Sequence, residues 1–235
     1  MTVIASVDNT VVCRELTKVY RQNSVAVHAL SDIELEVPKR DFLCLSGPSG
    51  SGKSTLLNLI GGLDTPTSGT VEVDGRRLDT MSKSELAAMR LRHIGFVFQA
   101  YNLIPVLSAR ENVEFVMQLQ GIEAKTRTEK ARAIMQEVGL EGLEERRPNE
   151  LSGGQQQRVA VARAIVSEPS LVLADEPTAN LDSKNAEMLM ALLRHMNEEH
   201  HVTFIFSTHD RLVMNLSKRL IGLRDGRVVS DQRQD

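Results

Sequence analysis

The sequence predicts an α/β fold in which a parallel-sheet core carries an antiparallel β subdomain and an inserted α-helical subdomain. Uninterrupted apolar runs at 42–45, 171–174 and 202–206 are typical of strands that are buried on both faces. A helical pattern from Ser183 to His200 separates the last two runs, and strands that alternate with helices pair in parallel. Apolar and polar residues alternate at 32–37, which indicates a strand with one solvated face and hence the antiparallel subdomain.

The first third of the chain contains the predicted antiparallel layer and the first buried strand. Val71 and Val73 alternate with polar neighbours before Asp74–Gly75, a dipeptide typical of tight turns. A glycine-rich turn follows the apolar run at 42–45 and leads into helical spacing. The apolar residues that follow this spacing are Leu56, Leu57, Leu59, Ile60 and Leu63.

Helical signals dominate the middle third. Ser108 and Glu111 have the spacing of a capping box, and a second helical pattern runs from Thr126 to Val138. Near the end of the chain, Asp225–Gly226 separates two short apolar runs, which predicts a hairpin. We therefore expect a single domain over residues 1–235, with its core at about 1–98 and 168–235 and its helical subdomain at about 99–167.

Composition argues against several classes of protein. With a net charge of −3 over 235 residues, the chain lacks a basic excess, so no nucleic-acid partner is expected. No stretch approaches the roughly 18 consecutive apolar residues of a membrane-spanning helix. The first ten residues also lack the pattern of a signal peptide, so we expect a cytoplasmic protein. Cys13 and Cys44 lie in apolar, strand-like runs outside any metal-binding pattern and are predicted to be buried core thiols.

Residues 47–54 match the phosphate-binding motif GxxxxGK[ST] and lie between a predicted buried strand and a predicted helix, as the motif requires. Glycine lets the backbone curl so that its N–H groups point toward the polyphosphate of ATP, whereas an ordinary glycine turn is the structural alternative. Lys53 is expected to pair with the β- and γ-phosphates, Ser54 to ligate Mg²⁺, and Thr55 to contact a phosphate. The predicted nucleotide-binding residues, typical of a P-loop NTPase (RecA-like) core, are Gly47, Pro48, Ser49, Gly50, Ser51, Gly52, Lys53, Ser54 and Thr55.

Two adjacent carboxylates, Asp175 and Glu176, follow the apolar run at 171–174. A nearby Mg²⁺ explains this pair better than a solvated acidic loop does. Because successive strand residues point to opposite faces, we expect the two carboxylates to have different roles. Asp175 suits the metal, usually through water, and Glu176 suits the attacking water, as its general base or as the residue that positions it.

Ser152, Gly153, Gly154 and Gln155 stand at the predicted start of another helix. The free N–H groups of a helix start bind anions, so this segment is predicted to be a second phosphate site. One ATP does not need two such sites from the same chain. The second site is therefore expected to close over the ATP of another subunit, although an ordinary helix cap is the structural alternative.

The order and spacing of these motifs resemble those of ABC-type ATPases over nearly the whole chain. The resemblance rests on the phosphate-binding loop, LSGGQ at 151–155, LVLADE at 171–176, the segment 179–182 and His209. It implies an ATP-hydrolysing homodimer that holds two ATP molecules between its subunits. The implied catalytic residues are Glu176, His209, Gln99 and Lys53, and the implied metal ligands are Ser54, Gln99 and Asp175.

The same resemblance implies roles for residues outside the phosphate-binding motif. Tyr20 would stack on adenine and Gln99 would join the two subdomains while sensing Mg²⁺ and the attacking water. Asp182 would be the acid of a loop between the subunits. His209 would contact the γ-phosphate. The structural alternatives are a packed tyrosine in a strand and a hydrogen-bonded histidine at a strand end.

Residues 61–64 and 94–103 and the QQQR sequence at 155–158 resemble the lipoprotein-release and macrolide-efflux branch of these ATPases. That resemblance implies a separate transmembrane permease, export rather than import, and a place on the cytoplasmic face of the inner membrane. It leaves room for a periplasmic adaptor that acts through the permease. A regulatory ATPase of the cell-division type, coupled to a membrane partner without cargo, is the alternative.

A third class, ABC ATPases that act on DNA or ribosomes, is disfavoured because the chain lacks a coiled-coil insert and a second ATPase domain. Residues 100–109 carry no formal charge and include an apolar segment at 103–107. In ABC ATPases this position receives a short cytoplasmic helix of the membrane subunit. The segment is therefore predicted to be a coupling surface, with packing inside the helical subdomain as the alternative.

Overall fold

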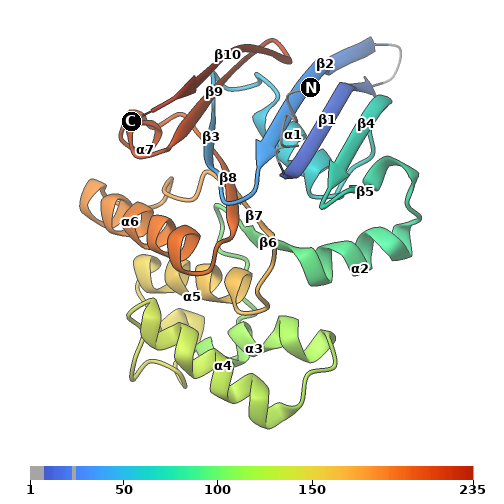
Figure 1. Ribbon diagram of the computed structural model, residues 1–235. Helices are drawn as coiled ribbons and strands as arrows, with labels where there is room; N and C mark the ends of the chain where they lie inside the picture. The colour runs from blue at the N-terminus through green and yellow to red at the C-terminus, as the bar shows by residue number, and fades with distance from the viewer. Residues whose placement is uncertain (1–7, 23–24, 235) are drawn as a thin grey trace, which may run out of the picture.

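The computed structural model describes residues 8–22 and 25–234, which contain two β-sheets (Figure 1). The strands of the larger sheet are β3 (Phe42–Ser46), β6 (Ile94–Val97), β7 (Leu171–Asp175), β8 (Thr203–Thr208), β9 (Arg219–Arg224) and β10 (Arg227–Arg233). Their order is β10-β9-β3-β8-β7-β6, in which β9 and β10 pair antiparallel and every other neighbouring pair is parallel. The predicted parallel core and terminal hairpin are therefore confirmed.

The predicted antiparallel layer is the second sheet. Its strands are β1 (Asn9–Gln22), β2 (Val25–Pro38), β4 (Ser68–Val73) and β5 (Arg76–Arg77), in the order β2-β1-β4-β5. Asp74 and Gly75, which join β4 to β5, have φ angles of 50° and 71°. Positive φ at both central residues is the geometry that a two-residue hairpin requires.

The parallel sheet separates two hydrophobic cores because alternate residues of each strand face opposite sides. Leu43 and Leu45 of β3 face the core that contains α1 (Lys53–Ile60) and the antiparallel sheet. Phe42 and Cys44 face the other core, which contains the buried side chains of five helices, α3 to α7. Both faces of the sheet are covered at β3, β7 and β8, which explains why the sequence of these central strands contains uninterrupted apolar runs.

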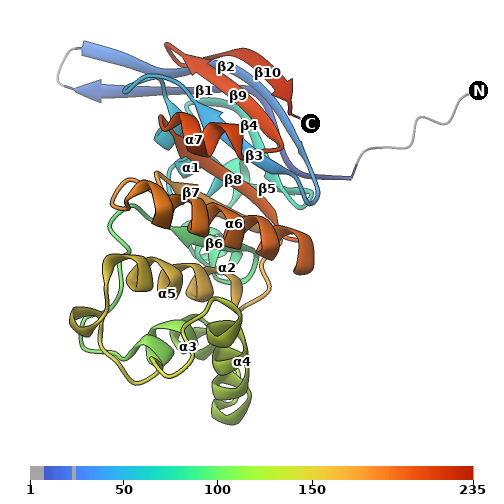
Figure 2. The same ribbon diagram turned by 90° about the vertical axis from the view of Figure 1, so that its left-hand side faces the viewer.

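The helices other than α1 are α2 (Lys83–His93), α3 (Ala109–Leu119), α4 (Ala124–Glu137), α5 (Gly153–Ile165), α6 (Ser183–Glu199) and α7 (Arg211–Asn215), with short 3₁₀ turns at Leu78–Thr80 and Pro148–Glu150. Figures 1 and 2 both show α3, α4 and α5 together beneath the parallel sheet. The predicted capping box of Ser108 and Glu111 is confirmed at the start of α3. The limits of a helical subdomain stay a prediction, because side chains of α3–α5 and of the parallel sheet form one continuous core.

The helix after the glycine-rich turn is shorter than predicted. It ends at Ile60 rather than at Leu63, which is 48% exposed. Gly61 caps the helix and Gly62 has a φ of 59°, so the backbone leaves the helical conformation before Leu63.

Both cysteines are buried thiols, as predicted. Burial raises the pKa of Cys13 and of Cys44 to about 12. Within the described part of the chain, no helix is long and apolar enough to cross a membrane. The expectation about a signal peptide concerns residues 1–10, of which 1–7 lie outside the described residues.

Candidate nucleotide site

The phosphate-binding loop connects β3 to α1, with Gly52 as the N-cap of the helix. Gly47 has a φ of 149°, and a Cβ atom there would lie 2.2 Å from the carbonyl oxygen of Leu223. Gly52 has a φ of 103°, and its Cβ would lie 2.7 Å from the carbonyl oxygen of Ala29. Side chains are therefore excluded at both ends of the loop, where the motif has glycine.

The polar atoms of this loop suit an anionic ligand. The Nζ atom of Lys53 donates to the carbonyl oxygens of Gly47 (2.8 Å) and Pro48 (3.0 Å), which leaves one of its three donors available. The hydroxyl of Ser51 is buried and has no hydrogen-bond partner among the described residues. A buried hydroxyl without a partner is costly, and a phosphate oxygen at this loop would satisfy it.

A cavity of about 540 Å³ lies over the loop and brings together side chains from five separate segments. Gln99, Glu176 and His209 line it together with the loop, although they lie far apart in the sequence. The strand ends that carry these segments meet at one edge of the parallel sheet, which is where α/β folds bind ligands. The predicted residues that line the cavity are Ser49, Gly50, Ser51, Gly52, Lys53, Ser54, Thr55, Gln99, Glu176 and His209.

Asp175, the last residue of β7, lies beside the start of α1. The hydroxyl of Ser54 donates to its Oδ1 atom at 3.1 Å, and the hydroxyl of Ser207 on β8 donates to the same atom. Hydroxyl and carboxylate oxygens are the ligands that Mg²⁺ prefers. Among the described residues, there is no group of three or more His, Cys, Asp or Glu side chains that could hold a metal ion. The donor set fits a Mg²⁺ that also takes phosphate and water oxygens as ligands.

Glu176 is separated from Asp175 by a change of backbone direction. The prediction that both are successive residues of one extended strand is wrong, because β7 ends at Asp175 and Glu176 has a φ of 47°. The left-handed turn still gives the two carboxylates different surroundings. Oε1 of Glu176 lies 2.8 Å from Nδ1 of His209, which must donate because a carboxylate oxygen accepts.

Gln99 follows β6, and its main chain is held from a distant segment. The Nδ2 atom of Asn180 donates to its carbonyl oxygen at 2.8 Å. This bond connects residues 81 positions apart and links the segment after β6 to the segment that precedes Asp182. The Gln99 side chain is left to line the cavity beside Glu176 and His209.

Tyr20 lies on β1 and does not line the cavity. Its side chain is 38% exposed, its hydroxyl donates to Oδ2 of Asp64 (2.8 Å), and the Nζ atom of Lys18 lies 4.9 Å from the centre of its ring. Burial and the bond to Asp64 raise the pKa of the hydroxyl. Across the hairpin Tyr20 pairs with Val27, which does line the cavity. An adenine above Tyr20 therefore stays a prediction.

Ser152 and Gln155 form a complete capping box at the start of α5. The Ser152 hydroxyl accepts from the N–H of Gln155 (3.3 Å), and Oε1 of Gln155 accepts from the N–H of Ser152 (2.8 Å). None of the residues 152–155 lines the cavity over the phosphate-binding loop of the same chain. Asp182 lies at another helix start, where it caps α6 by accepting from the N–H of Asn185 (2.8 Å).

Sequence reasoning missed several residues of the site. Val27, His28 and Ala29 line the cavity, as does Ala179 of the segment 179–182, and the Ser207 hydroxyl donates to Asp175. The first three lie on β2, whose pairing with β1 carries them to the loop. They belong to no motif, so only the register of this hairpin could have identified them.

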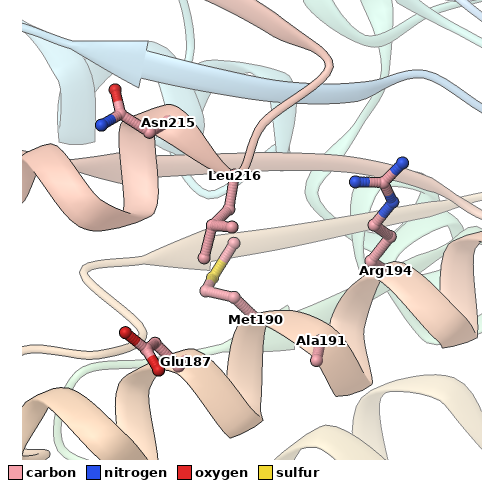
Figure 3. Close-up of a pocket in the computed structure, with 6 residues that line it drawn as sticks. All are labelled: Glu187, Met190, Ala191, Arg194, Asn215 and Leu216. Carbon is pink, nitrogen blue, oxygen red and sulfur yellow. The ribbon is translucent and has the colours of Figure 1, made fainter. Parts of the chain in front are cut away.

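A second cavity of about 680 Å³ lies between α6 and α7 (Figure 3). Its mostly apolar lining contains no phosphate-binding loop and one carboxylate. This lining does not suit a polyphosphate. The residues that line it are Glu187, Met190, Ala191, Arg194, Asn215 and Leu216.

Comparison with known proteins agrees with the geometry. The model of the family described as ABC transporter matches residues 30–179. The chain is 46% identical to an ABC transporter ATP-binding protein, YknY, of Bacillus subtilis, over 90% of this chain and 92% of that protein. It is 40% identical to the macrolide export ATP-binding/permease protein MacB of Mannheimia succiniciproducens over 95% of its own length, but it spans only 34% of MacB.

Solved structures show the same fold. The dimeric post-hydrolysis structure of the ATP-binding cassette MJ0796, bound to ADP and Pi, superposes with a TM-score of 0.87 at 41% identity and covers 95% of this chain and 98% of that chain. MJ0796 comes from Methanocaldococcus jannaschii. The predicted P-loop NTPase core is confirmed by this likeness. With a phosphate-binding loop, a matching family model and relatives of full length, the chain belongs to the ABC transporter family as an ATP-binding subunit that hydrolyses ATP.

Proposed function

We propose that this chain hydrolyses Mg²⁺-ATP in a homodimer that powers a separate transmembrane permease. The main support for this proposal is the set of residues that line the nucleotide cavity. Gln99, Glu176 and His209 share a cavity with the phosphate-binding loop, whereas residues 152–155 of the same chain do not line it. The start of α5 is exposed at Ser152 and is free to close over the nucleotide of a second chain.

The residues around the cavity would divide the work of hydrolysis. The loop N–H groups and Lys53 would hold the phosphates, and Ser54 and Asp175 would hold Mg²⁺, with Gln99 as a further oxygen ligand. Bound Mg²⁺ would neutralise phosphate charge. Glu176 would accept the proton of the attacking water, and His209 would orient the Glu176 carboxylate and contact the γ-phosphate.

The second chain would complete each site. Ser152, Gly153, Gly154 and Gln155 would bind the phosphates from the opposite side, and Asp182 would lie between the subunits. MJ0796, which is dimeric in its solved structures, supports this arrangement because it matches nearly the whole chain. Tyr20 would stack on adenine at the open end of the cavity, beside Val27.

A groove of about 350 Å³ between α2, β6 and α5 suits a helix of the permease. Phe98 and Asn102 line this groove, and Val106, in the predicted coupling segment, is 73% exposed. The chain would then lie on the cytoplasmic face of the membrane. The name of MacB, a macrolide export ATP-binding/permease protein, favours export, with a periplasmic adaptor acting through the permease.

Phosphate release by the purified chain, measured at increasing chain concentration, tests this function. Two chains must meet to complete one site, so the rate per chain should rise with concentration and disappear when Mg²⁺ is chelated. A rate per chain that does not depend on concentration or on Mg²⁺ would refute the shared site.

A further inference from the structure

A partly buried arginine on α5 donates two hydrogen bonds to the main chain just after Gln99. Its Nη2 atom donates to the carbonyl oxygen of Tyr101 (2.8 Å) and its Nη1 atom to that of Asn102 (2.6 Å). This residue is Arg163, and burial lowers the pKa of its guanidinium. Among the described residues, the acceptors of its hydrogen bonds are these two carbonyls. Their two charge-assisted hydrogen bonds offset part of the cost of burying the guanidinium.

The two carbonyls belong to residues in an unfavourable backbone conformation. Tyr101 and Asn102 have φ angles of 56° and 50°, and neither is glycine. Left-handed conformations of such residues persist only where the surrounding structure holds them. The paired N–H groups of Arg163 bind both carbonyls of this turn at once, which a single point charge could not do with the same geometry.

The side chain of Tyr101 reaches the other end of the same helix. A Cβ atom on Gly153 would lie 3.0 Å from the Tyr101 hydroxyl, so this hydroxyl lies directly over the first turn of α5. Arg163 is in the last turn of α5. Both ends of α5 therefore contact Tyr101.

The segment held by Arg163 also borders the nucleotide cavity and the groove that is proposed to receive a permease helix. Gln99 lines the nucleotide cavity and its carbonyl is held by Asn180, whereas Asn102 and Arg163 line the groove beside α2. A helix seated in that groove would contact the guanidinium that fixes the turn. Phe98, directly before Gln99, also lines the groove, and two residues separate Gln99 from Asn102.

We propose that Arg163 and Tyr101 are positioning residues that fix Gln99 to α5. Through them Gln99 and the Ser152–Gly154 segment move as one unit. The inference rests on the proposed function. It assigns no contact with ATP to either positioning residue.

Arg163→Ala should lower kcat for ATP hydrolysis about tenfold while KM and the affinity for ATP change less than about twofold, because the nucleotide contacts of the core remain. Arg163→Lys keeps the charge but not the paired donors. Its kcat should therefore lie between that of Arg163→Ala and that of the wild type. Arg158→Ala is the matched control. Arg158 is on the same helix, is partly buried and donates to the carbonyl of Val138 (3.4 Å), away from the turn.

Two outcomes would overturn the inference: a kcat of Arg163→Ala within twofold of the wild type, or an equal loss in Arg158→Ala at a similar melting temperature. If Arg163→Ala does not melt cooperatively, Arg163→Lys decides by the same kcat criterion. A wild-type chain whose rate does not depend on chain concentration refutes the shared site instead. That result is distinguishable, because it precedes any comparison of variants.

Discussion

Nδ1 of His209 lies 2.8 Å from Oε1 of Glu176, so two of the four residues with proposed catalytic roles are hydrogen-bonded to one another. The His209 side chain is 74% exposed and that of Glu176 is 19% exposed, which leaves the histidine open to the cavity. The bond orients the Glu176 carboxylate before any nucleotide binds. Preorganisation of this kind favours a general base over a purely structural ion pair.

Glu176→Gln should lower kcat by about 100-fold or more and leave ATP binding unchanged, because an amide cannot accept the proton of the attacking water. Phosphate release and equilibrium binding of a fluorescent ATP analogue measure the two effects. His209→Ala serves for comparison, since it removes the partner of Glu176 and should lower kcat less if Glu176 is the base. Wild-type turnover by Glu176→Gln would refute its assignment.

Asp175→Asn should raise the Mg²⁺ concentration needed for half-maximal hydrolysis and lower the maximal rate, since a neutral amide binds Mg²⁺ more weakly than a carboxylate. The asparagine retains an oxygen that the hydroxyls of Ser54 and Ser207 can reach, so the fold should persist. The control is Ser207→Ala, which removes a hydrogen bond to the same carboxylate but no charge. A Mg²⁺ titration of phosphate release distinguishes the variants. An unchanged titration curve for Asp175→Asn would contradict the metal site.

Val106→Glu should weaken co-purification with a permease while leaving ATP binding by the isolated chain unchanged. Val106 is 73% exposed, so a glutamate there should not disturb the fold. Leu103, in the same segment, is a poorer site for this substitution because its side chain packs against the core. Val229→Glu, on β10 and 60% exposed, is the matched control for an added surface charge. Equal co-purification of both variants would show that the segment is not the coupling surface.

Both thiols should resist a thiol reagent at pH 8 until the chain unfolds. Burial raises the pKa of Cys13 and of Cys44 to about 12, with nearby Glu34 and Glu176 respectively adding to the effect, so almost no thiolate forms in the folded state. Below about pH 9 both states keep the proton, and between there and pH 12 only the unfolded state loses it, so the free energy of unfolding falls. Rapid labelling of either thiol in the folded chain would contradict this burial.

The motifs predicted most of the fold because each carries its own local signal. The phosphate-binding loop, the capping box at Ser108 and the buried runs of β3, β7 and β8 follow from glycine, capping and periodicity rules. Helix ends have a weaker local signal. The apolar spacing continues to Leu63, but α1 ends at Ile60 and Gly62 has a positive φ.

The contacts that align the site could not be predicted in the same way. Asn180 holds Gln99 and Arg163 holds Tyr101 across 81 and 62 positions, by side-chain bonds to main-chain carbonyls that leave no periodic pattern. The left-handed conformation of Glu176 is likewise set by its tertiary surroundings rather than by its residue type. Such features need the folded backbone.

In the proposed dimer, the start of α5 of one chain closes over the ATP of the other chain. Ser152→Asp tests it in a Glu176→Gln chain, because aspartate retains the helix cap but places a negative charge toward the phosphates of the partner's ATP. Ser152→Asn keeps the cap without the charge and is the control.

Light scattering with and without Mg²⁺-ATP tests this closure most directly, because it measures the mass of the particle in solution. The mass of Glu176→Gln should double from one chain to two when ATP is added. The added Ser152→Asp change should prevent the doubling, and the added Ser152→Asn change should impair it less. A mass that stays at one chain with saturating ATP, or an equal ATP-dependent dimer in the presence of Ser152→Asp, would refute the shared ATP site.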